Sequence, residues 1–126
     1  MLNFRQFEAG PDPFGRKYQV MFKWLQTAIS IRHSDTVDVK FVLVDDQGAR
    51  TEKTIALPHA FLRELSRAAG RKMDDAWCSR IAELHLLRQV ETGEDMEKDL
   101  VTLTAGEIQE HAAEVARLEA APSPAR

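Results

Sequence analysis

The chain contains few of the residues that would mark particular classes of protein. Its 126 residues include one cysteine, Cys78, so no disulfide can form within the chain. A lone thiol is typical of a protein in a reducing compartment. No apolar run approaches the roughly 20 residues of a membrane span, and the first residues lack the charged-then-apolar pattern of a signal peptide. We therefore expect a cytoplasmic protein with no membrane partner.

Motifs that carry chemistry are also missing. There is no Cys-x-x-Cys, no His-Glu-x-x-His, no glycine-rich phosphate loop and no nucleophile elbow. Cys78 and His85 are seven residues apart, or roughly 10 Å along a helix, so their spacing does not suit a shared metal ion. His33 and Asp35 have the chemistry of a base and its orienting partner, but two polar residues in a turn are usually only a turn. The sequence predicts no enzyme, no metal site and no cofactor.

The composition is that of one ordinary globular domain, with 44% apolar and 29% charged residues. The formal net charge of −3 argues against a protein that coats nucleic acid or an anionic membrane. The charge is unevenly placed: residues 1–72 hold 12 Lys/Arg and 8 Asp/Glu, a net of +4, whereas residues 73–126 hold 5 and 12, a net of −7. Such a split suits either a dipolar surface or self-association.

The clearest local signal is a hairpin over residues 36–56. Apolar and polar residues alternate from Val37 to Val44 and again after Arg50, and Asp46-Gln47-Gly48 between them suits a turn. Residues 14–31 fit both a helical stripe and a strand alternation. We favour a strand there, because a hairpin needs a third strand to be stable.

Helical periodicity and capping residues predict three helices. Pro58 can open the first and Gly70 can close it. Asp74 is a suitable N-cap for the second, and Thr104 with Glu107 forms a capping box before the third. The helices expected are 58–69, 74–91 and 105–118.

These elements predict an α+β fold in which a small antiparallel sheet, made of the hairpin and neighbouring strands, packs against about three helices. Residues 100–103 are short and β-prone, which indicates an edge strand. We expect an irregular N-terminal arm over residues 1–13, a single domain over 14–119 and a flexible tail over 120–126.

The front half of the chain has more apolar residues than one core face requires. An exposed apolar patch usually marks an interface. The leading prediction is therefore a small intracellular protein-interaction domain that self-associates, for example as a homodimer, or binds another protein. The residues predicted for this interface are Val20, Phe22, Trp24, Val42 and Val44.

The alternative prediction is nucleic-acid binding. It would use the basic hairpin and helix 58–69, or a helix-turn-helix-like pair over residues 58–91. Asp74 and Asp75 at the start of the second helix of that pair would repel phosphates. The cations predicted for this surface are Lys40, Lys53, Arg63, Arg67, Arg71 and Lys72.

Overall fold

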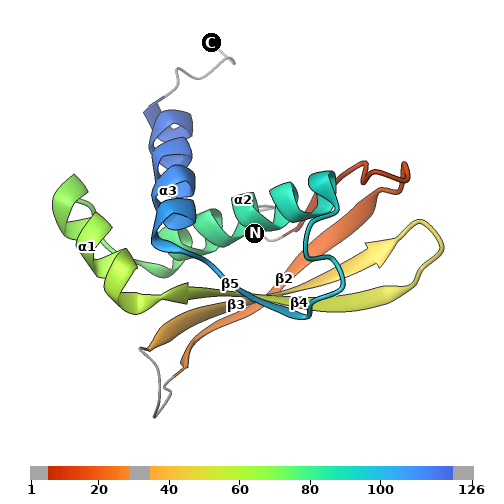
Figure 1. Cartoon of the computed structure of the whole chain (residues 1–126), viewed down its shortest axis with the longest axis horizontal. Helices are drawn as coiled ribbons and strands as arrows, with labels where there is room; N and C mark the ends of the chain where they lie inside the picture. The colour runs from red at the N-terminus through yellow and green to blue at the C-terminus, as the bar shows by residue number, and fades with distance from the viewer. Residues whose placement is uncertain (1–5, 29–34, 121–126) are drawn as a thin grey trace.

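A computed structural model describes residues 6–28 and 35–120 of the chain (Figure 1). Within these residues, five strands form one sheet in the order β1-β2-β3-β4-β5, and three helices lie together on one side of it (Figure 1). The expected α+β fold is therefore confirmed, with a sheet that is mostly antiparallel. The elements in chain order are β1 (Gln6–Ala9), β2 (Tyr18–Ala28), β3 (Thr36–Asp45), β4 (Arg50–Pro58), α1 (His59–Ala69), α2 (Asp75–Thr92), β5 (Leu100–Thr102) and α3 (Ala105–Ala120).

The predicted hairpin is confirmed as β3 and β4, and its alternation decides which face is buried. Successive side chains of a strand point to opposite faces. At the turn, the Asp45 carboxylate accepts hydrogen bonds from the backbone N–H groups of Gln47 (2.9 Å) and Ala49 (2.8 Å), and Gly48 has a φ of +83°. The β3 residues buried against the helices are Val37, Val39, Phe41 and Leu43.

Within the ambiguous stretch over residues 14–31, residues 18–28 form strand β2, which confirms the preferred reading for those residues. This strand pairs with β3 along its whole length, and the register shifts between Phe22 and Trp24. Lys23 is the extra residue of that β-bulge. Residues 29–34 of the sequence lie outside the described residues.

The N-terminal arm differs from the irregular segment expected over residues 1–13, because Gln6–Ala9 is strand β1 and pairs with residues 18–21. Asp12 organises the connection to β2. Its carboxylate accepts hydrogen bonds from the backbone of Phe14 and Arg16, from the Arg16 side chain and from the Tyr18 hydroxyl. Burial opposes ionisation of Asp12, but these hydrogen bonds outweigh it and lower the pKa of its carboxyl group.

The three helices begin and end close to the predicted residues. Gly70 closes α1 with a φ of +61°, and Asp74 caps α2 by accepting the Trp77 backbone N–H at 2.9 Å. The capping box of Thr104 and Glu107 is present at the start of α3. Helix α2 lies across the sheet, α3 packs on α2, and α1 packs on β4 and α3 (Figure 1).

Helix α1 buries less of itself than its periodicity predicts. Of its apolar stripe only Leu62 is fully buried, Leu65 is half-buried, and Phe61 is 39% exposed. The reason is its position: α1 lies at the end of the helical layer, where fewer elements can cover it (Figure 1).

Strand β5 was expected at an edge, and it lies there, but it runs parallel to β4. Two helices connect β4 to β5, and such a long crossover allows a parallel pair. Lys53 of β4 fastens the loop before β5, since its ammonium donates to the backbone carbonyls of Met96 and Lys98, the latter at 2.8 Å.

Among the residues described here, no helix is long and apolar enough to cross a bilayer. The tail was expected over residues 120–126. Its first residue, Ala120, is the last residue of α3, and residues 121–126 lie outside the described part.

The N-cap of α2 provides a direct test of the helix boundaries. We expect Asp74→Ala to lower the free energy of unfolding by about 1 kcal/mol, because the Trp77 N–H loses its acceptor. Asp75→Ala is the matched control, since it removes an equal charge from the first turn without removing the cap. Urea unfolding followed by circular dichroism measures both, and equal losses in the two variants would contradict the capping role.

Candidate functional site

The predicted interface residues are divided between the two faces of the sheet. Val20 is completely buried beneath the helices, and this corrects its assignment to a free surface. Phe22 also faces the helices, with its ring edge-on to Phe41 at 6.3 Å between centroids. The sequence could not separate these residues because the bulge at Lys23 reverses the alternation along β2. The residues on the opposite, open face of the sheet are Trp24, Val42 and Val44, but Val42 is also corrected, because only 6% of its surface is exposed.

On the open face, the two lysines nearest Trp24 are already paired. Glu52 accepts hydrogen bonds from Lys23 (2.6 Å) and lies 3.2 Å from the Lys40 ammonium. These two contacts, Lys23 first, lower the pKa of the Glu52 carboxyl group. The Lys40 ammonium also lies 4.9 Å from the centre of the Trp24 ring, within cation–π range. The lysines beside Trp24 are thus compensated by Glu52.

One edge of the sheet is only partly paired. The described residues of β1 pair with residues 18–21 of β2, whereas β3 pairs with β2 as far as residue 28. In the part of the chain that the structure describes, residues 24–27 therefore have a strand on one side only. Alternate N–H and C=O groups of this segment point away from β3. The segment offers roughly 13 Å of unpaired strand edge.

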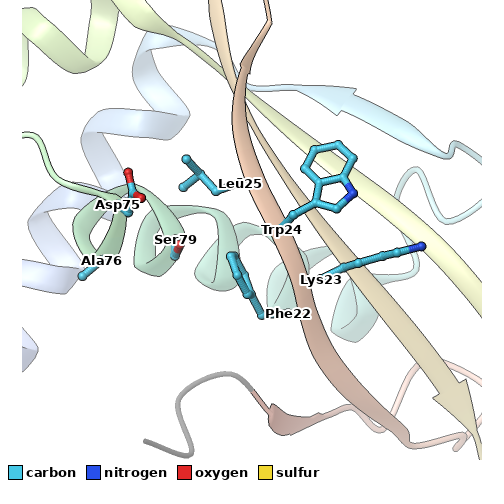
Figure 2. A pocket seen from close by; sticks show the side chains of 7 residues that line it. All are labelled: Phe22, Lys23, Trp24, Leu25, Asp75, Ala76 and Ser79. Atoms are coloured by element: carbon cyan, nitrogen blue, oxygen red, sulfur yellow. The ribbon is translucent and has the colours of Figure 1, made fainter.

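A groove of about 460 Å³ lies along this edge (Figure 2). Phe22 and Leu25 point from β2 toward α2, while Trp24 and Lys23 lie on the other side of the strand (Figure 2). The far wall is the first two turns of α2. An extended peptide placed here would meet backbone on one side and side chains on the other. The lining residues are Phe22, Lys23, Trp24, Leu25, Asp75, Ala76 and Ser79.

The bulge at Lys23 limits where another strand can pair. Natural sheets protect exposed edges with bulges and with lysine side chains, which prevent indiscriminate edge-to-edge association. Lys23 does both, because it is the extra residue of the bulge and its ammonium is held by Glu52. A partner strand therefore has to pair with residues beyond Lys23.

A second apolar groove, of about 210 Å³, lies between α1 and α3. It is lined mainly by alanines, together with Leu65 and Trp77. Arg71 at its rim is already committed, since its guanidinium pairs with Glu119 and lies 6.0 Å from the Trp77 ring. Among the described residues, no strand lines this groove, and few polar groups are present to orient a ligand.

The buried histidines form a small polar cluster between α2 and α3. His85 Nδ1 and His111 Nε2 are 3.1 Å apart, so one ring donates an N–H to the other when both are neutral. Nearby, Gln89 donates to the Asp95 carbonyl, while its buried Oε1 accepts no hydrogen bond from any residue that the structure describes. The adjoining cavity of about 30 Å³ has the volume of one water molecule, which is too small for a substrate.

The other residues considered for chemistry lie apart from one another. Cys78 is buried, and burial raises the pKa of its thiol to about 12. His59 is on α1, where its Nδ1 is 3.1 Å from Arg63. Asp35 is exposed, and His33 lies outside the described residues. Among the residues that are described, no three His, Cys, Asp or Glu side chains form a group able to hold a metal ion.

The predicted nucleic-acid surface is not continuous. Lys53 is corrected to a core residue, since it is 3% exposed and its ammonium is bound by two carbonyls. Lys40 lies on the open face of the sheet, away from the helices. The other four cations lie on α1 and on the turn after it. Helix α1, the first helix of the expected helix-turn-helix, packs chiefly on β4 and α3. Those four cations are Arg63, Arg67, Arg71 and Lys72.

No protein-family model, curated protein or solved structure significantly matches this chain. The site is therefore defined by geometry alone. Sequence reasoning identified Phe22 and Trp24 but missed Leu25 and the α2 wall. Nothing in the sequence signals Ala76 or Ser79, because only the crossing of α2 over β2 brings them to the strand edge.

The histidine pair predicts a loss of stability in acid. Burial, the neighbouring His85 and Arg88 lower the pKa of His111 from 6.5 to about 4. Between these values the unfolded chain binds a proton that the folded chain does not, so stability is present above pH 6.5 and falls as the pH drops toward 4. The difference corresponds to roughly 3 kcal/mol. Urea titrations at several pH values measure it, and His111→Gln is expected to flatten the dependence while His59→Gln leaves it unchanged.

Glu83 on α2 predicts the opposite dependence. Burial raises the pKa of its carboxyl group from 4.5 to about 7, although Arg80 opposes the change. The folded protein therefore holds this proton more tightly, and stability is lost as the pH rises through that range. We expect Glu83→Gln to raise the free energy of unfolding at pH 8 by roughly 1–2 kcal/mol, with no gain at pH 4. Glu91→Gln, exposed on the same helix, is the control, and a Glu83→Gln protein no more stable than wild type at pH 8 would refute the argument.

Proposed function

We propose that this protein is a protein-interaction domain that accepts an extended segment of another protein along the edge of β2. The observation that carries the proposal is the strand edge at residues 24–27, which is unpaired on one side in the described part of the chain and borders the groove beneath α2. The proposal assigns no catalytic step. An intracellular location, expected from the single cysteine, belongs to the same proposal.

Strand addition explains why a groove and an unpaired edge occur together. In this mode, main-chain hydrogen bonds provide affinity, and pockets for alternate side chains provide specificity. A segment paired with residues 24–27 would direct every second side chain into the groove, where Leu25 and Ala76 provide apolar surface. Its other side chains would lie beside Trp24 on the open face.

The size of the edge favours a short segment over a second complete sheet. About 13 Å of edge accommodates roughly four residues of a partner strand. The bulge at Lys23 prevents the pairing from continuing toward β1. Self-association through this edge would therefore rest on a short contact, and light scattering at micromolar concentration tests it independently: a monomer leaves the peptide-binding proposal intact and removes the homodimer.

A library of short linear peptides displayed on phage, selected against the whole protein, tests the function. We expect selected peptides to slow amide exchange at residues 24–27. We also expect Ala76→Tyr to weaken their binding at least about tenfold, because the larger ring fills a groove lined by the exposed Ala76. Ala60→Tyr, at an exposed alanine of α1 outside the groove, is the matched control.

Two results would refute the proposal. One is a selection whose peptides leave the exchange of residues 24–27 unchanged. The other is unchanged affinity in Ala76→Tyr when that variant unfolds at the same temperature as Ala60→Tyr.

A further inference from the structure

Gln89 of α2 is a buried polar side chain whose hydrogen bonding is incomplete. The residue is 3% exposed, and its side-chain amide donates to the Asp95 carbonyl at 2.8 Å. The amide oxygen, Oε1, accepts no hydrogen bond from any residue that the structure describes. A buried acceptor without a partner destabilises a fold, and such atoms are rare in native proteins. Oε1 therefore calls for a ligand that carries a donated proton or a positive charge.

The cavity of about 30 Å³ that Gln89 lines has a negative charge left over. Arg88 and Asp95 also line it, but each is cancelled by a partner outside the cavity, a glutamate of α3 at 3.3 Å and a lysine of the loop after α2 at 3.2 Å. Glu94 and Glu107 line it as well, and neither forms a salt bridge with a described residue. The cavity therefore attracts positive charge.

Two further features of the cavity favour a cation. It adjoins the last turn of α2, the negative end of the helix dipole, and this turn contains no basic residue. His85, which lines the cavity, does not offset the negative charge. Burial lowers the pKa of its imidazole below 6.5, so the ring is neutral at pH 7.

The ligands present indicate which kind of cation fits. Among the described residues, no three His, Cys, Asp or Glu side chains form a group able to hold a metal ion. Zinc and calcium usually need such a set of ligands. Potassium can instead be held by neutral carbonyl oxygens, which replace its hydration shell, and Gln89 Oε1 is an oxygen of that type. Potassium and ammonium ions are each about the size of a water molecule, which is the volume of this cavity.

We propose that this cavity binds one monovalent cation of the size of potassium or ammonium, held by Gln89 Oε1 and by the negative charge of Glu94 and Glu107. The ion joins α2, the loop after it and the first turn of α3, since these segments supply the three residues. The site is separate from the groove at the edge of β2, which is lined by the first two turns of α2. It does not depend on strand addition.

Thermal unfolding of the whole protein in different chloride salts at constant ionic strength tests the site. Replacing about 100 mM tetramethylammonium, which is too large for the cavity, by potassium or ammonium should raise the melting temperature by about 4 °C. A gain with one of the two ions alone identifies the ion that the site takes. Nuclear magnetic resonance gives a local measurement, since the side-chain amide signals of Gln89 should shift on titration with that ion. Equal melting temperatures in all the salts, with unshifted Gln89 signals, would mean that the cavity holds only water and would overturn the inference.

Three variants separate binding at this site from a general effect of charge. Gln89→Met and Glu107→Gln should each remove most of the gain in melting temperature. Glu91→Gln is the matched control, because it removes an equal charge from an exposed position of α2 outside the cavity. Glu107→Gln keeps an oxygen that can cap the Thr104 backbone N–H, so it remains informative even if Gln89→Met does not fold. A gain that persists in Glu107→Gln, or that is lost equally in Glu91→Gln, would contradict the proposed site.

Discussion

The structure depends on the one-sided covering of its sheet. Val39, Phe41 and Leu43 of β3 can be buried only if helices pack on that face, and α2 lies directly across it. The hydrophobic core therefore lies between the helices and one face of the sheet. Because the helices cover one face alone, the open face must be polar or compensated, and the pairing of Lys23 and Lys40 with Glu52 provides this. The candidate surfaces on the sheet and along its edge both result from helices covering only one of its faces.

Two buried charged side chains hold the loops of the molecule in place by forming hydrogen bonds with backbone groups of those loops. Asp12 receives the N–H groups of the loop between β1 and β2, and Lys53 donates to carbonyls of the loop that leads to β5. Neither residue is available to a ligand, although both are charged. Each of these buried charges stabilises a loop by hydrogen-bonding its backbone groups. Leaving a buried backbone group without a hydrogen bond would cost more free energy than ordering the charged side chain.

Glu83 stands apart from those two residues. It is half-buried, whereas they are fully buried, and it forms no salt bridge with any described residue. Its pKa and that of His111 change in opposite directions on folding, so their effects on stability partly cancel between pH 4.5 and 6.5. A mild pH dependence of the wild-type protein would conceal two larger opposing ones.

The sequence by itself determined the local elements, since alternation, Gly48, Asp74 and the Thr104 capping box act between neighbouring residues. It could not place strand β1, whose four residues are recognisable only through their pairing with β2, nor bury Lys53, whose carbonyl partners are more than 40 residues away. It also could not separate Phe22 from Trp24, because the bulge between them puts two residues with the spacing of one face on opposite faces. The groove was decided by tertiary structure alone, because it forms where α2 crosses β2 and brings residues of the two elements together.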